Sequence, residues 1–264
     1  MRKRLLGCLI AMVLLPMQGV ASISNAELED FESALWKVRA DFHMLTVMAG
    51  SKTYISNLDD AIAQAQSVMT DLRNDAEGSE ERALVDDLNK NWDILKGSAQ
   101  SNTMAEQGFT NAYTIQDVNE MPTAMSLRIG SFSGATEGQY DDIRELSAYL
   151  QRMTSEYLNI AADPAGGMAS GSDQSRIEFK DAVPEFERLL AAAKKNHADD
   201  EAISRALSQV GVKWMFIRES MVKFYENAVP YLIYRYTNQM VDTMSQAISL
   251  ASTDVEKPSF GPVE

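Results

Sequence analysis

The sequence contains few residues of the kinds that carry catalysis or bind metals. It has 2 histidines, His43 and His197, and 1 cysteine, Cys8. The histidines lie in different halves of the chain, and His197 is followed by Asp199 and Asp200 in a predicted turn. Neither histidine has partners at a spacing typical of a metal site or of acid–base catalysis. The sequence also lacks a Ser-His-Asp set, a phosphate-binding loop and a paired-carboxylate motif. We therefore predict a protein that is not an enzyme and that needs no cofactor or metal.

Composition and charge restrict the classes of partner. The 264 residues are 45% hydrophobic and 23% charged, and the formal net charge is −14. A strongly acidic surface repels nucleic acid and anionic lipid headgroups, so we expect neither as a partner. A single cysteine excludes a disulfide framework and every site that needs several cysteines.

The N-terminus resembles an export signal. Three basic residues, Arg2 to Arg4, precede an apolar run from Leu5 to Leu15, and Gly19-Val20-Ala21 follows it. A basic start, an apolar stretch of about 10 residues and a small-x-small end are typical of a secretory signal peptide. We predict cleavage after Ala21, which leaves a soluble, more acidic protein without a membrane span. In a bacterium this protein would be periplasmic.

Apolar residues recur at alternating intervals of three and four over most of the remaining chain. This spacing places them on one stripe of a helix, as in helices that pack nearly parallel in a bundle. Strand-like alternation is absent, so we predict an all-α protein. A phase slip between Leu45 and Ile55, which includes Gly50, separates two of these series, and we interpret it as a local change within the first helix. Four such series cover residues 28–45, 55–72, 143–160 and 203–224.

The two halves of the sequence can be aligned with each other. Asp60-Ala61 and Asp181-Ala182 open similar segments, which lead to Trp92 and Trp214, two expected core residues, and then to Pro122 and Pro230. We predict an internal duplication in which two helical hairpins form one elongated antiparallel four-helix bundle. The predicted segments are a signal peptide at 1–21, a first repeat at 22–134, a second repeat at 135–251 and a disordered tail at 252–264.

One segment carries a family resemblance. Gln151-Arg152-Met153-Thr154-Ser155-Glu156 is similar to the Gln-Arg-Met-Leu-Ser-Gln signature of the PilJ-type domain, the sensory module of type IV pili chemotaxis transducers and related nitrate/nitrite sensor kinases. Trp214 and Val229-Pro230 resemble the end of that domain, and His43-Met44-Leu45-Thr46 is a weaker match in the first half. The resemblance implies two tandem copies of a periplasmic helical sensor, often dimeric, that binds a small ligand or a protein.

The resemblance also implies a candidate anion site. In the nitrate-sensing relatives the signature helix supplies an arginine to an anion, and Arg152 is the matching position, with Gln151 and Ser155 beside it. A guanidinium suits a planar anion because it donates two parallel hydrogen bonds. The residues alone also allow another interpretation, in which Arg152 lies at the flank of the bundle and pairs with Glu156 four residues later.

Two hypotheses of function follow. The first is an exported sensory or ligand-binding bundle whose partners are a small anion or a membrane chemoreceptor, and which forms a homodimer. No transmembrane helix or signalling domain follows the predicted bundle in the sequence, so we expect a freestanding binding or accessory protein. The second is a structural or adaptor protein of the periplasm that has no small-molecule ligand.

Overall fold

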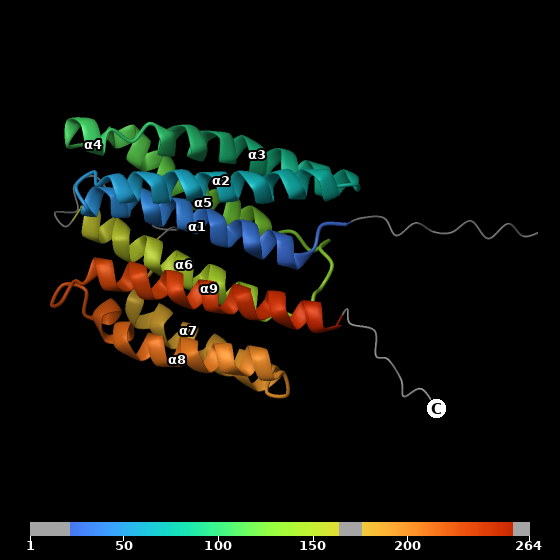
Figure 1. The fold of residues 1–264 in the computed structure, drawn as a ribbon. Helices are drawn as coiled ribbons and strands as arrows, with labels where there is room; N and C mark the ends of the chain where they lie inside the picture. The colour runs from blue at the N-terminus through green and yellow to red at the C-terminus, as the bar shows by residue number, and fades with distance from the viewer. Residues whose placement is uncertain (1–21, 164–175, 256–264) are drawn as a thin grey trace, which may run out of the picture.

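The computed structural model describes residues 22–163 and 176–255, and these residues form eight long helices and one short one (Figure 1). The all-α prediction is confirmed, since the only extended pairing in the described ranges is an isolated bridge between Ser24 and Thr136. The predicted signal peptide lies outside the described residues. The helices are α1 (Asn25–Val47), α2 (Lys52–Asp75), α3 (Ser79–Gln100), α4 (Met104–Gln107), α5 (Ala112–Gly130), α6 (Asp141–Ala162), α7 (Phe179–Asn196), α8 (Glu201–Val222) and α9 (Pro230–Val255).

The helices form two four-helix bundles that lie side by side. Helices α1, α2, α3 and α5 enclose one apolar core, the N-terminal bundle, and α6, α7, α8 and α9 enclose a second, the C-terminal bundle. Helices α1 and α6 pack against each other at the seam between them (Figure 1). Each half therefore supplies four long helices, and the prediction of one four-helix bundle built from two hairpins is corrected in this respect.

The cause of this correction is the turn at Gly50. Ala49 and Gly50 have φ angles of 50° and 76°, in the left-handed region that ends a right-handed helix. A Cβ atom at Gly50 would lie 2.4 Å from the Cα atom of Ala105, so the turn needs glycine for close approach as well. The phase slip in the sequence thus marks the end of α1 and a reversal into α2, and not a distortion within one helix.

The same side-chain motif joins the second helix of each half to the third. In the N-terminal bundle, Trp92 Nε1 and Lys96 Nζ both donate to Gln66 Oε1, at 3.0 and 2.9 Å. In the C-terminal bundle, Trp214 Nε1 and Arg218 donate to Glu187 Oε1, at 3.1 and 3.0 Å. Both indoles are buried, as expected for core residues. The motif pairs α2–α3 with α7–α8 as equivalent helices of the two halves.

The starts of α1 and α6 are held together. A capping box begins α1, with Glu27 N donating to Ser24 Oγ at 3.2 Å and Ser24 N donating to Glu27 Oε2 at 2.8 Å. Beside it, Asn25 N donates to Thr136 O at 2.9 Å and Thr136 N donates to Ile23 O at 3.0 Å. The equivalent first helices of the two halves therefore begin at the same end of the molecule and run parallel (Figure 1).

The C-terminal helix is longer than the sequence suggested. Pro230 is its first residue, a position where the missing amide N–H costs no hydrogen bond. Residues 252–255 continue α9, so the predicted disordered tail is wrong for these four positions, and 256–264 lie outside the described residues. Among the described helices, none is long and apolar enough to cross a membrane.

Candidate functional site

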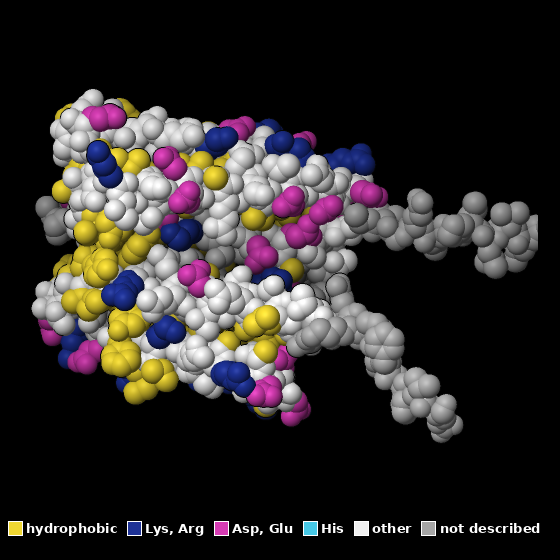
Figure 2. Space-filling view, in the orientation of Figure 1, with side chains coloured by type: hydrophobic (Ala, Val, Ile, Leu, Met, Phe, Trp, Pro, Cys, Tyr) yellow, Lys and Arg dark blue, Asp and Glu magenta, His cyan; other side chains and the backbone are white. Residues whose placement is uncertain are grey.

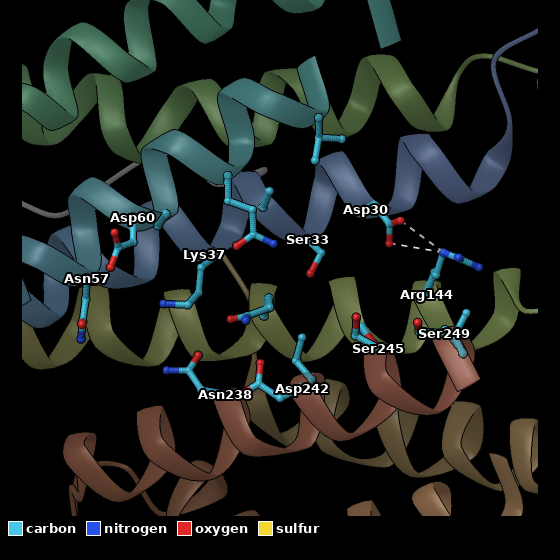
Figure 3. Close-up of a pocket in the computed structure, with 18 of the residues that line it drawn as sticks. Asp30, Ser33, Lys37, Asn57, Asp60, Arg144, Asn238, Asp242, Ser245 and Ser249 are labelled. Atoms are coloured by element: carbon cyan, nitrogen blue, oxygen red, sulfur yellow. Dashed lines mark hydrogen bonds and ion pairs between the residues drawn. The ribbon is translucent and has the colours of Figure 1, made fainter. Parts of the chain in front are cut away.

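A cleft of about 640 Å³ lies between the two bundles. Helices α1 and α2 form one wall, and α6 and α9 form the other, along the middle of the face shown in Figure 2. Its volume is in the range typical of pockets for small ligands. Five lining residues are apolar, and the others are polar: Asp30, Ser33, Lys37, Asn57, Asp60, Gln64, Arg144, Ser147, Gln151, Tyr234, Asn238, Asp242, Ser245, Ser249 and Ser252 (Figure 3).

One end of the cleft is organised around Lys37 and Tyr234. The Lys37 ammonium forms an ion pair with Asp41, whose side chain is fully buried at 0% exposure. The Tyr234 hydroxyl accepts hydrogen bonds from Lys37 Nζ at 3.4 Å and from Asn57 Nδ2 at 3.0 Å. These contacts join α1, α2 and α9. They also leave the Lys37 ammonium paired with groups of the protein.

The pKa shifts of Asp41 and Tyr234 suit a ligand-binding site and not a site of proton transfer. Burial raises the pKa of the Asp41 carboxyl, and the adjacent Lys37 charge opposes the effect. Burial, followed by the Asp41 charge, raises the pKa of the Tyr234 hydroxyl well above its usual range. Tyr234 therefore stays protonated at physiological pH and serves as a hydrogen-bonding group.

The other end holds a second ion pair. Arg144 Nε of α6 lies 3.3 Å from the Asp30 carboxylate of α1, and the pair bridges the two bundles (Figure 3). Ser245 and Ser249 lie on α9 beside it, and Ser33 lies on α1 between the two ends (Figure 3). Both cations that line the cleft are thus already paired with carboxylates.

Three other side chains of the cleft have a carboxylate or amide oxygen without a hydrogen-bond partner among the described residues. Asp60 on α2 and Asp242 on α9 form no hydrogen bond or ion pair with any residue that the structure describes. Burial raises the pKa of Asp242, although the Lys37 charge opposes this shift. Gln151 on α6 is only 3% exposed, and its Oε1 atom has no hydrogen-bond partner within the described part of the chain. A buried amide oxygen without a partner is unfavourable, but this atom has almost no accessible surface, so a molecule in the cleft does not contact it in this arrangement.

The structure does not bring the three residues of the predicted anion site to one cavity. Gln151 lines the cleft, whereas Arg152 lies against the Trp36 ring at 5.5 Å and borders a separate surface pocket. Ser155 is fully buried and accepts a hydrogen bond from Arg39 at 3.0 Å. Gln151 and Arg152 are successive residues and point about 100° apart, so they face different cavities, while Ser155, on the same face of α6 as Gln151, is covered by Arg39.

The alternative interpretation of Arg152 is also corrected. Glu156 pairs with Arg39 at 2.7 Å and not with Arg152. Arg39 is 1% exposed, and it also donates from Nε to Asn119 Oδ1 at 3.0 Å. This network joins α1, α5 and α6 beneath the seam. The sequence analysis missed Arg39, because a single arginine beside an apolar stripe carries no signal that it is buried.

The two histidines have structural partners. His43 is buried and its Nε2 atom lies 2.8 Å from Asn119 Oδ1; burial, followed by the Arg39 charge, lowers its pKa to about 3, so the ring is neutral. His197 Nε2 lies 2.8 Å from Asp142 Oδ1, joining the end of α7 to the start of α6. Over residues 22–163 and 176–255, no group of three or more His, Cys, Asp or Glu side chains is placed to hold a metal ion.

The sequence analysis also missed Lys37, Asp60 and Asp242 of the cleft, because isolated charges on different helices form no motif. In comparisons with known proteins, no protein-family model, curated protein or solved structure matches the chain.

Proposed function

We propose that this protein binds a small polar ligand in the cleft between its two bundles, and that its function is recognition and not catalysis. The observation that carries the proposal is the cleft of about 640 Å³, which is lined by side chains of both bundles. Polar side chains converge on the same space from four helices (Figure 3). Ligand pockets usually have more apolar lining than this cleft, but convergent polar groups are what fix the orientation of a bound ligand.

The position of the cleft suits a sensory role. One wall belongs to the N-terminal bundle and the other to the C-terminal bundle, so a ligand that contacts both walls stabilises one arrangement of the bundles over others. A ligand shifts such an equilibrium only through different contacts in the two arrangements. This is the sensory function that the PilJ-type resemblance implies. As part of the same proposal, the chain is exported to the periplasm after cleavage at Ala21 and acts with a membrane chemoreceptor.

The test is a thermal-shift screen with neutral, anionic and cationic small molecules. Ser245 lines the cleft, and Ser245→Phe places a ring in it; Gln246→Phe is the matched control, because Gln246 is the exposed neighbour on α9 that does not line the cleft. We expect at least one compound to raise the Tm of the wild type and of Gln246→Phe but not of Ser245→Phe. A screen without any such compound contradicts the proposal.

The same screen tests the anion site of the signature. If nitrate or nitrite raises the Tm of the wild type and Arg152→Ala removes the shift while Ser245→Phe retains it, the ligand binds at Arg152. The site in the cleft is then wrong, and the interpretation from the resemblance holds.

A second candidate function is that of an adaptor, which an exposed aromatic patch favours. The patch lies on α8, on α9 and in the loop between them, where Figure 2 shows hydrophobic side chains gathered at one end of the molecule. Phe216 is 68% exposed and stacks on Tyr236, with ring centroids 5.9 Å apart, and Tyr225 is 81% exposed. Exposed aromatic residues of this kind are typical of protein interfaces.

A pull-down from periplasmic extract tests the adaptor function. We expect Phe216→Ser to lose a partner that Tyr113→Ser retains, since Tyr113 is 78% exposed but lies on α5 in the other bundle. Capture should persist at high salt, because an apolar contact is not screened. Equal capture by the two variants contradicts the candidate.

A further inference from the structure

A second, smaller pocket lies at the end of the molecule where α4 is found (Figure 1). The last turns of α1 and α6, the first turn of α5 and the segment from α4 to α5 enclose it, and none of its described lining residues lines the cleft. Its volume is about 220 Å³, whereas an apolar cavity of about 150 Å³ already holds a benzene-sized ring. Most of its lining is apolar, from Phe42, Met104, Phe109, Ile115 and Ala162.

The polar wall of this pocket has one orientation, which Arg39 determines. Arg39 Nε can only donate, so the Asn119 atom that it contacts at 3.0 Å is the amide oxygen. His43 Nε2 lies 2.8 Å from the same oxygen and therefore carries the ring proton. The Nδ1 atom of the neutral ring is then a hydrogen-bond acceptor. Burial, followed by the Arg39 charge, lowers the pKa of His43 to about 3, so Nδ1 stays unprotonated at physiological pH.

The His43 Nδ1 atom is an acceptor without a donor. No residue that the structure describes donates to it, although the side chain is only 2% exposed. Nδ1 differs from Gln151 Oε1 in that it keeps accessible surface, and His43 lines the pocket. A buried acceptor without a partner is unfavourable, so a donor on a molecule in the pocket would be stabilising there.

Asn159 adds a donor to the same wall. Since the Asn119 oxygen faces Arg39 and His43, the Asn119 Nδ2 group is the one that donates to Asn159 Oδ1, at 3.3 Å. This contact leaves the Nδ2 group of Asn159 without an acceptor among the described residues, on a side chain only 4% exposed that lines the pocket. His43 and Asn159 both contact the one Asn119 amide, so an acceptor and a donor lie together on this wall.

The edge of the pocket is held by hydrogen bonds between α3 and α5. The Thr103 hydroxyl donates to Phe109 O at 2.7 Å, and the Thr110 hydroxyl donates to Asn102 Oδ1 at 3.0 Å. These bonds fix the backbone that carries Phe109, whose side chain is 59% exposed and lines the pocket. The pocket therefore has an aromatic side chain at its surface and another, Phe42, in its buried wall. Aromatic ligands pack favourably against such rings.

We infer that this pocket binds a neutral phenol, with the aromatic ring among the apolar side chains and the hydroxyl group at the wall formed by His43 and Asn159, where it donates to His43 Nδ1. A hydroxyl group both donates and accepts, so it complements the two polar groups of the wall. A carboxylate would instead meet Asp163, which also lines the pocket. This site is separate from the cleft and goes beyond the proposed function, so either site can fail without the other.

Isothermal titration calorimetry with 4-methylphenol tests the inference. Toluene lacks the hydroxyl group, and 4-methylanisole keeps the oxygen but lacks its proton. We expect 4-methylphenol to bind more tightly than either by about tenfold, as for one hydrogen bond to an otherwise unpaired buried acceptor. The absence of binding by 4-methylphenol, or equal binding by toluene, overturns the inference.

Two exposed aromatic residues provide a matched pair of variants. Phe109→Ala removes a lining ring and should weaken the binding of 4-methylphenol by about three- to tenfold. Tyr113→Ala is the control, because Tyr113 is 78% exposed and does not line the pocket, and it should change affinity by less than about twofold. Ser245→Phe, in the cleft, should also leave affinity unchanged. Equal loss by the two alanine variants, or loss in Ser245→Phe, places the phenol elsewhere and contradicts the inference.

His43→Phe tests the hydrogen bond itself. It keeps a ring at this position and removes Nδ1, and the Asn119 oxygen retains the Arg39 donor. The preference for 4-methylphenol over toluene should fall to within about twofold. A variant that keeps the full preference would show that the hydroxyl group does not donate to His43. The comparison of Phe109→Ala with Tyr113→Ala tests the position of the ring without this buried replacement.

Discussion

The guanidinium of Arg39 and the carboxylate of Glu156 form a buried ion pair at 2.7 Å, with side-chain exposures of 1% and 5%. Arg39 belongs to α1 and Glu156 to α6, so the pair crosses the seam between the two bundles. Asn119 and Ser155 accept the other Arg39 hydrogen bonds that cross between helices. The seam therefore contains a polar contact that is satisfied only when the two bundles are correctly aligned.

Arg39→Met should lower the free energy of unfolding by about 3–5 kcal/mol, because it leaves the Glu156 charge buried without a partner. The double replacement Arg39→Met with Glu156→Met should recover part of this loss, since no isolated charge remains. Arg205→Met is the control, as Arg205 and Glu201 form an exposed pair at 67% and 88%, and it should cost less than about 1 kcal/mol. Urea unfolding followed by circular dichroism measures all three. A double variant less stable than Arg39→Met would contradict this account.

Glu29 should make the stability depend on pH. Burial, followed by the charge of Glu32 and then of Glu145 on α6, raises its pKa from 4.5 to about 8. The folded state thus holds this proton more tightly than the unfolded state does. The stabilisation is complete below about pH 4.5 and is lost as pH rises through about 8.

Glu29→Gln should remove this dependence. Its urea midpoint should change less than that of the wild type between about pH 5 and pH 8, and it should exceed the wild-type midpoint above about pH 8. Glu219→Gln is the control, because Glu219 is exposed and its hydrogen bond from Lys223 lowers its pKa. Parallel curves for the wild type and Glu29→Gln would show that Glu29 does not titrate in this range.

Gly50 should not tolerate a side chain, whereas Gly97 should tolerate one. Gly50→Ala places a Cβ atom 2.4 Å from the Cα atom of Ala105 at a φ of +76°, and we expect a loss of about 1–3 kcal/mol. Gly97 is an exposed position within α3 with no neighbour within 4 Å of an added Cβ. Gly97→Ala should therefore raise stability by about 0.5–1 kcal/mol. Thermal unfolding of Gly50→Ala and Gly97→Ala tests both predictions. Similar destabilisation by the two changes would contradict the requirement for glycine in the turn at Gly50.

The two tryptophans should stabilise different parts of the molecule. Trp92 packs within the N-terminal core, at 6.4 Å from the Phe31 ring, and Trp214 packs within the C-terminal core, at 4.3 Å from the Phe186 ring. Each Trp→Ala replacement should cost about 3–5 kcal/mol. Hydrogen exchange should show the loss of protection mainly in α2 and α3 for Trp92→Ala and mainly in α7 and α8 for Trp214→Ala. Equal loss in both bundles after either change would show that they unfold as one unit.

The sequence by itself determined the helical class, the capping box at Ser24 and Glu27, and the burial of Trp92 and Trp214. These features are local, since apolar spacing indicates which face of a helix is buried and a cap depends on residues three positions apart. The sequence did not determine which helices pack together, because periodicity identifies a buried face but not the helix that covers it. Only the tertiary structure made α1 and α6 the seam, directed Gln151 and Arg152 to different cavities, and brought Asp60 and Asp242 to one cleft. These are contacts between residues distant in the chain, and their geometry follows from how whole helices pack.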